Sequence, residues 1–135
     1  MMITVLSKIA LQQSAPTSET MKWVKQLLNN WALQEDAILI YQKSDMKLAG
    51  HSDAGYLIGP KAYRRVAGHF FISNGSPFPP NNGAVLTVSQ TIKVFITSAV
   101  EAELGSLFIN AMEAVYMRQI LKDVGHKQDW IPMQT

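Results

Sequence analysis

The chain has 135 residues, of which 47% are hydrophobic and 16% are charged, and its net charge is +2 at pH 7. This length suits one domain with a buried core, and the composition excludes an intrinsically disordered protein. The absence of cysteine excludes disulfides and thiolate zinc sites, and it favours a reducing intracellular compartment, either cytoplasmic or nuclear. No apolar run approaches the ~20 residues of a membrane-spanning helix, and residues 1–11 do not resemble a signal peptide, so we expect no membrane partner.

The first clear element is an amphipathic helix over residues 17–33. Thr17 is a good N-cap residue, and Glu19 suits the positive end of a helix. The face expected to lie in the core carries four apolar residues at helical spacing: Met21, Val24, Leu28 and Trp31. Trp23 and Leu27 widen this face, which fits a helix that packs between two surfaces. Residues 1–14 fit either the end of a helix or a short strand, and the sequence leaves both open.

The middle of the chain predicts an antiparallel meander. Residues 37–41 form a short apolar run typical of a buried strand, and residues 47–56 follow closely enough to pair with it as a hairpin. Alternation along this second strand places His51 and Asp53 on the same face. A connection rich in proline and asparagine is expected at residues 74–83. Three further strands are predicted, at residues 66–73, 83–89 and 92–97.

A long helix is predicted from residue 98 to residue 124. Ser98 and Glu101 have the spacing of a capping box, and Gly125 stands where a left-handed residue commonly ends a helix. The face expected to pack on the sheet carries five residues: Val100, Leu104, Leu107, Ala111 and Val115. Residues 130–135 begin another extended segment. Together these elements predict an α+β fold in which a mixed sheet is followed by a long helix.

Asp53 and Glu103 are the two acids that we expect to do chemistry. Glu101 already has a capping role, and residues two apart on a helix point about 200° apart, so Glu103 is the glutamate left to face a site. Mg²⁺ is bound by a few carboxylates with waters and substrate phosphates, so the pair predicts an incomplete metal site. Two plainer interpretations stay open. Asp53 also fits a turn before Gly55, and both glutamates also fit the positive end of the helix dipole.

Lys61, Arg64 and Arg65 are expected on a loop, where they fit either phosphate contacts or a solvated surface. The three histidines are too scattered along the chain for a metal-ligand pattern, and we interpret them as structural or surface residues.

Three short segments occur in an order typical of one family. They are HSDAGY at residues 51–56, AGHFF at residues 67–71, and SAVEAEL at residues 98–104, which a long helix follows. In this order and spacing they resemble the ribonuclease H domain of copia-type retrotransposon polyproteins. Residues 13–17 and the helix after them resemble the segment that joins reverse transcriptase to that domain. By this resemblance, residues 1–34 are a connection segment and residues 35–135 are the N-terminal portion of a ribonuclease H-like domain.

The resemblance implies a mixed sheet of three antiparallel strands and later parallel ones, covered by helices. It matches Asp53 to the aspartate on the family's first strand and Glu103 to the glutamate on its first long helix. In the family these acids help bind two Mg²⁺ ions, or Mn²⁺ in their place, that cut the RNA strand of an RNA–DNA hybrid. The hybrid and the reverse transcriptase domain of the parent polyprotein are therefore the expected partners.

The chain departs from the family at its end. The family's next strand reaches a third aspartate, whereas this sequence stops at Thr135, and neither Asp123 nor Asp129 is placed to replace that acid. We therefore expect a C-terminally truncated domain that is inactive alone. Two alternatives stay open. One is a non-catalytic module that self-associates through Trp23, Trp31 and an open sheet edge. The other is a vestigial nucleic-acid-binding module that uses the three basic residues.

Overall fold

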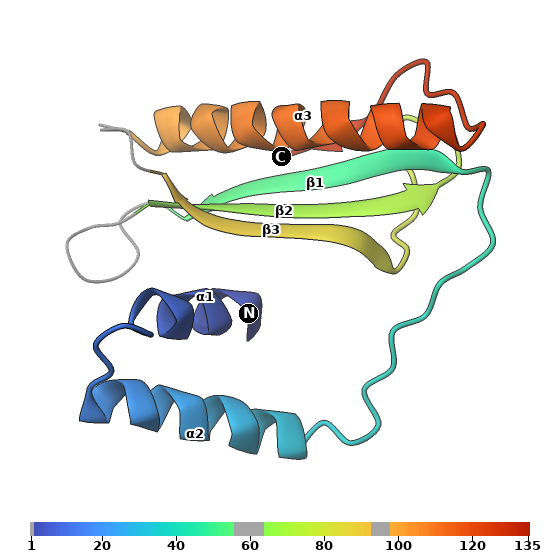
Figure 1. The fold of residues 1–135 in the computed structure, drawn as a ribbon. Helices are drawn as coiled ribbons and strands as arrows, with labels where there is room; N and C mark the ends of the chain where they lie inside the picture. The colour runs from blue at the N-terminus through green and yellow to red at the C-terminus, as the bar shows by residue number, and fades with distance from the viewer. Residues whose placement is uncertain (1, 56–63, 93–97) are drawn as a thin grey trace. The chain divides into compact units, whose positions relative to one another are not determined.

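The computed structural model describes residues 2–55, 64–92 and 98–135. It divides the chain into two compact units, Met1–Leu39 and Ile40–Thr135. The first unit is a helix pair and the second is a sheet with one long helix (Figure 1). The mixed α+β fold predicted from the sequence is confirmed.

The helix pair of the first unit consists of α1 (Met2–Leu11) and α2 (Ser18–Ala32). Thr17 caps α2 as predicted, because its hydroxyl accepts the backbone N–H of Thr20 while the Thr20 hydroxyl accepts the N–H of Thr17. Thr20 Oγ1 also donates to Gln12 Oε1, which joins the turn after α1 to the first turn of α2. The segment left open by the sequence is therefore largely helical.

Only part of the apolar face predicted to be buried on α2 is buried. Met21, Leu28 and Trp31 are 53–54% exposed, whereas Thr20 and Leu27 are buried. Within its unit α2 packs against α1, which is a narrow partner that covers only one side of a helix. Apolar residues lie on more than one side of α2, so their spacing alone did not identify the side that α1 covers.

The sheet of the second unit has the strand order β3-β2-β1-β4. The meander of β1 (Lys47–Gly55), β2 (Arg64–Ser73) and β3 (Ala84–Ile92) is antiparallel, and β4 (Met133–Gln134) lies parallel to β1. The predicted loop over residues 74–83 is confirmed as an irregular connection. The first residue of the strand expected at residues 92–97 belongs to another strand, because Ile92 is the last residue of β3. Residues 93–97 lie outside the described residues.

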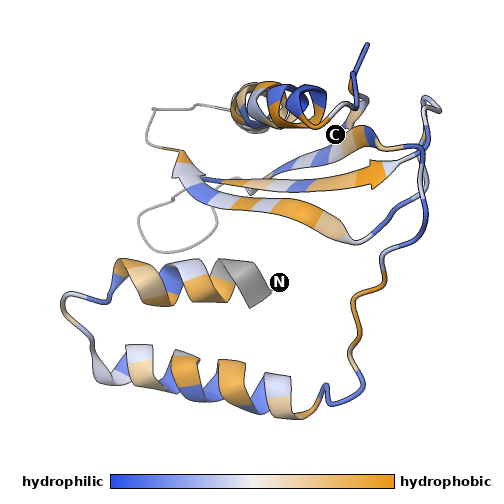
Figure 2. Ribbon diagram, turned by 45° about the vertical axis from the view of Figure 1, so that its right-hand side comes forward, coloured by the Kyte–Doolittle hydropathy of each residue, from blue (hydrophilic) through white to orange (hydrophobic). Residues whose placement is uncertain are grey.

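The strand predicted at residues 37–41 is wrong. This apolar stretch is coil, as Figure 2 shows, and its three central side chains, Ile38, Leu39 and Ile40, are 59–80% exposed. It cannot pair with β1 as a hairpin because β2 and β4 already occupy the two sides of that strand. Instead Tyr41 donates its hydroxyl to the Ala84 carbonyl, and the backbone of Gln42 bonds to the side chain of Asn82.

Helix α3 (Ala99–Asp123) lies along one face of the sheet (Figure 1). Its predicted ends are confirmed: the Ser98 hydroxyl accepts the N–H of Glu101, and Gly125 follows the helix with φ 92°. The core between helix and sheet has two parts. One contains Leu48, Phe70, Ala114 and Leu121, and the other contains Val66, Ile92 and Ala102.

The face of α3 predicted to pack on the sheet is wrong by roughly 110° around the helix. Val100, Leu104 and Val115 are 59–74% exposed. The buried residues of α3 are instead mostly small or polar: Ala102, Ser106, Asn110, Ala114 and Leu121. Apolar residues occur on every side of this helix, so hydrophobic periodicity does not identify the packed side. The small residues do so because they let the helix backbone approach the sheet closely.

The β4 side of β1 is closed by Gln128 and the residues that follow it. The buried Gln128 side chain accepts the Leu48 N–H at 2.9 Å and donates to the Met46 carbonyl at 2.8 Å. Further along the strand, the Gly50 N–H donates to the Pro132 carbonyl. One glutamine amide thus takes the place of a strand at the start of β1, where an unpaired backbone would otherwise be exposed.

Candidate functional site

Asp53 lies near the end of β1, two residues before Gly55, and its side chain is exposed. Its neighbour Ser52 is buried and contacts α3, so by strand alternation Asp53 starts on the opposite face of the sheet. That face also carries His51, as predicted. A carboxylate in this position is available to a cation or to solvent.

Glu103 lies in the second turn of α3 and is half-buried, whereas Glu101 is exposed. Around the helix axis, Glu103 points only about 30° away from the centre of the side of α3 whose residues are buried against the sheet. The two glutamates therefore differ in the way the sequence predicted. The reason differs, however, because Glu103 follows the stripe of Ala102 and Ser106 and not the apolar face that was expected to be buried.

Ser106 connects the two acids through the backbone. Its hydroxyl donates to the carbonyl of Asp53 at 2.6 Å, and Glu103 precedes it by one helical turn. The structure thus brings Asp53 and Glu103 to the same end of the domain. The Asp53 side chain nevertheless leaves β1 on the face opposite α3, which carries Glu103, so the two carboxylates can meet only around the β4 side of that strand. Asp53 lies beyond the described β1–β4 pairs, which are Gly50 with Met133 and His51 with Gln134.

A buried polar cluster supports this arrangement, and the sequence reasoning missed it. The amide of Asn110 donates to Ser52 Oγ and to the Ala67 carbonyl, both at 2.9 Å. Ser52 and Ser106 lie 3.2 Å apart, oxygen to oxygen. Gly68 leaves room for the amide, since a Cβ there would lie 2.3 Å from Asn110 Oδ1. The signal in the sequence was the pair Ser106 and Asn110, one turn apart in the otherwise apolar stretch of residues 104–112.

Asp123 and Asp129, the two acids closest to the chain's end, lie elsewhere. Asp123 ends α3, about 30 Å along the helix axis from Glu103. Asp129 adjoins Gln128, which binds Leu48, and five residues of strand put Leu48 about 17 Å from Asp53. Among residues 2–55, 64–92 and 98–135, no three of His, Cys, Asp and Glu gather as a metal site.

The basic residues do not form the predicted loop. Lys61 lies outside the described residues, while Arg64 and Arg65 belong to β2. Arg65 is 8% exposed, and its guanidinium donates to Ser89 Oγ on β3 at 3.2 Å. Arg65 is therefore part of the sheet, because the strand begins two residues earlier than predicted and draws this side chain against β3.

Three rings stack on the face of the sheet opposite α3. His51 and His69 are directly paired across β1 and β2, with ring centroids 6.2 Å apart, and Phe71 lies 5.3 Å from His51. His51 Nε2 is 2.7 Å from Asn81 Oδ1. These contacts give the two histidines structural roles, as predicted.

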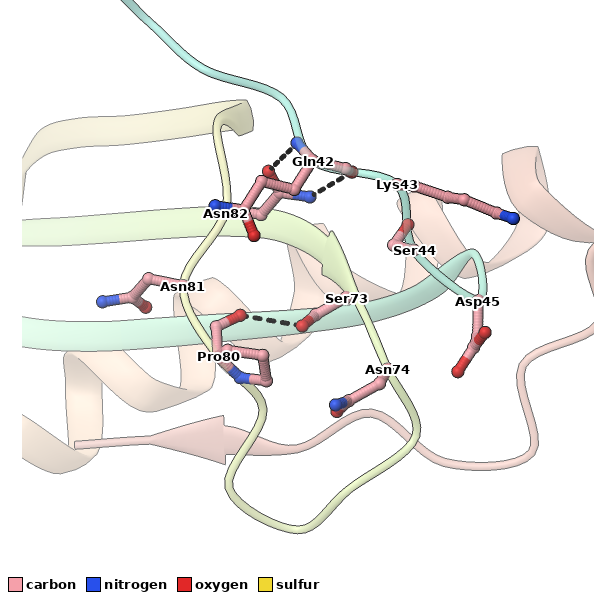
Figure 3. A pocket seen from close by; sticks show the side chains of 9 residues that line it. All are labelled: Gln42, Lys43, Ser44, Asp45, Ser73, Asn74, Pro80, Asn81 and Asn82. Atoms are coloured by element: carbon pink, nitrogen blue, oxygen red, sulfur yellow. Dashed lines mark hydrogen bonds between the residues drawn. The ribbon is translucent and has the colours of Figure 1, made fainter.

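A small polar pocket of about 120 Å³ opens at the other end of the sheet (Figure 3). It lies beside the start of β1 and the end of β2, and its lining includes Asp45, Ser73 and Asn82. Inside it Ser73 donates to the Pro80 carbonyl, and Asn82 bonds to both backbone groups of Gln42. The Asn82 amide thus binds the segment before β1, and the pocket is remote from Asp53.

Comparison with protein-family models found no match, and comparison with curated proteins found no significant match. Among the helices in the described part of the chain, none combines the length and the apolar character needed to cross a bilayer.

Proposed function

We propose that this chain is a ribonuclease H-like domain of a retroelement polyprotein, related to domains that cut the RNA strand of RNA–DNA hybrids. The observation that carries the proposal is the topology around the acids. An antiparallel meander leads through α3 to a strand that lies parallel to β1, with Asp53 near the end of β1 and Glu103 in the second turn of α3. This order agrees with the fold that the sequence resemblance implies.

The acids in the described residues do not by themselves fit a pair of metal ions. Mg²⁺ needs near-octahedral oxygen ligands, and two-metal sites hold ions ~4 Å apart with several shared carboxylates. Here the Asp53 side chain leaves β1 on the face opposite α3, which carries Glu103, and both Asp123 and Asp129 are remote from this pair. We therefore propose that the chain alone binds a hybrid weakly and does not hydrolyse it.

The test compares the chain with a version extended by Asp-Asn after Thr135. The parallel register pairs Gly50 with Met133 and His51 with Gln134, so a residue added after Thr135 would lie level with Asp53. Cleavage of a labelled RNA–DNA hybrid is measured with Mg²⁺ and with Mn²⁺. We expect cleavage only by the extended chain, and its loss with Asp53→Asn or Glu103→Gln.

Two results would contradict the proposal. Cleavage by the unextended chain that survives Asp53→Asn would place the chemistry elsewhere. An extended chain that is folded by circular dichroism but neither binds nor cuts the hybrid would remove the ribonuclease H assignment.

A non-catalytic module for self-association is the second candidate function. It is favoured by the exposed apolar side of α3, which the ribonuclease H proposal leaves unexplained.

A further inference from the structure

The side of α3 that points away from the sheet is strongly apolar. We call it the outer face and define it by six residues with their exposed fractions: Val100 74%, Leu104 67%, Phe108 68%, Met112 46%, Val115 59% and Tyr116 62%. A surface helix of a monomer normally carries polar residues on this side. Contiguous exposed apolar patches of this kind usually mark interaction sites.

The size of the outer face fits one half of a small protein interface. At ~25 cal/mol/Å², the ~1.5–3 kcal/mol gained by fully burying such a side chain corresponds to ~60–120 Å². The exposed fractions of the six residues therefore present roughly 200–450 Å² of apolar surface. A stable interface buries about 800 Å² per partner, with a polar rim around its apolar centre. The outer face therefore supplies the apolar centre of such an interface, and the polar residues beside it on α3 would form its rim.

A stripe of exposed residues that overlaps the outer face at Leu104, Phe108 and Val115 has the spacing of a coiled-coil seam. Seven exposed residues of α3 follow one another at alternating steps of three and four: Glu101, Leu104, Phe108, Ala111, Val115, Arg118 and Lys122. Such a repeat keeps one stripe facing a partner helix. The stripe is apolar in its middle, acidic at its start and basic at its end.

This stripe is complementary to itself in the antiparallel direction. When two copies pair about a point between residues 109 and 110, Leu104 meets Val115 of the second copy and the large Phe108 meets the small Ala111. At both ends Glu101 meets Arg118. A parallel pair would instead bring Glu101 against Glu101 and Arg118 against Arg118, which is unfavourable.

We propose that the outer face of α3 is a homodimer interface in which two copies of this chain pair their α3 helices antiparallel. A two-fold axis at the centre of the seam makes every contact occur twice. The interface lies on the side of α3 away from the sheet, so it leaves Asp53 and Glu103 uncovered and does not depend on the proposed function. It also differs from self-association through a sheet edge.

The first experiment measures the mass in solution by sedimentation equilibrium over a range of concentrations. We expect a monomer–dimer equilibrium whose dissociation constant rises roughly 100-fold or more with Phe108→Asp, because an aromatic residue at the centre of an interface is lost twice. The matched control is Phe78→Asp, which makes the same change at an 84% exposed phenylalanine in the loop between β2 and β3. Circular dichroism confirms that both variants stay folded.

The second experiment tests the direction of pairing. Glu101→Arg and Arg118→Glu each place like charges together and should each weaken the dimer about tenfold, whereas the double variant should restore it. If α2 of the same chain, a membrane or another protein covered the outer face, the double variant would show no restoration. A chain that is monomeric at every concentration, a dimer unaffected by Phe108→Asp, or a double swap that fails to restore pairing would each overturn the proposal.

Discussion

The hydroxyl of Ser106 donates a 2.6 Å hydrogen bond to the backbone carbonyl of Asp53, and this bond fixes α3 to the end of β1. Asn110, one turn later, fixes the same helix to Ala67, which is the residue paired with Asp53 across β1 and β2. Two adjacent strands are therefore attached to one helix at one level of the sheet. The position of Glu103 relative to Asp53 depends on these two attachments.

Ser106→Ala should lower the free energy of unfolding by about 1–3 kcal/mol, because it removes a fully buried hydroxyl and leaves the Asp53 carbonyl without this donor. Urea denaturation measures the change. The matched control is Ser44→Ala, since the Ser44 hydroxyl makes no hydrogen bond to any residue that the structure describes. Equal stability of the two variants would contradict the role given to Ser106.

Gly68→Ala should destabilise the second unit by about 1–3 kcal/mol, because the new methyl group would lie 2.3 Å from Asn110 Oδ1 and 3.1 Å from Val88 Cβ. Gly75→Ala is the control, since its nearest neighbour would be 3.7 Å away. In the double variant that combines Gly68→Ala with Asn110→Ala, the loss of unfolding free energy should be smaller than the sum of the losses in the two single variants. Full additivity would show that Gly68 and Asn110 do not interact.

Asn82→Ala should release the segment before β1 from the sheet. The Asn82 side chain accepts the Gln42 N–H and donates to the carbonyls of Gln42 and Ile72. Hydrogen exchange at the Gln42 amide should therefore accelerate, while amides in the centre of β2 stay protected. Asn74→Ala serves as the control, and unchanged exchange at Gln42 would argue against this attachment.

Lys61 and Arg65 should respond differently to removal of their charges. Lys61→Ala should lower by about one the slope of log affinity for a hybrid against log salt concentration, as expected for the loss of one phosphate contact. Arg65→Ala should lower stability, because that guanidinium is buried against Ser89. Binding measured by fluorescence anisotropy at several salt concentrations, together with urea denaturation, separates the two effects. An Arg65→Ala chain that keeps its stability and shows a smaller salt dependence of hybrid binding would contradict the role in the sheet and support a phosphate contact by Arg65.

The ends of the helices were predictable because capping is local. Thr17, Ser98 and Gly125 do what their residue types favour, and each needs only its own turn of helix. The meander was predictable for a similar reason, since the aromatic and branched residues of 66–73 and the proline-rich connection are properties of short segments.

The packed sides of the helices were not predictable from the same patterns. Both α2 and α3 carry apolar residues on several sides, and the true contact stripe of α3 consists of small and polar residues, with Asn110 and Ser106 fully buried. Their burial depends on Gly68 and Ser52, which lie more than 40 residues away in the sequence. The strand expected at residues 37–41 failed likewise, because only the whole sheet shows that both sides of β1 are occupied.

The candidate site was predictable in part. Asp53 and Glu103 were chosen from residue type and spacing, and the structure brings them to one end of the domain. Strand alternation then separates their side chains, which depends on Ser52 facing α3. Sequence spacing identifies the acids, but only the packing of α3 determines which way each one leaves the backbone.

The bonds of Gln128 to Met46 and Leu48 join residues 82 and 80 positions apart, whereas the meander joins neighbouring segments. Contacts of such long sequence separation form slowly, because a long loop must close before they give any stability. We expect the meander and α3 to assemble first and the Gln128 closure to follow the rate-limiting step. Weakening that closure would then leave the refolding rate nearly unchanged and speed unfolding, so Gln128 sets the lifetime of the folded chain.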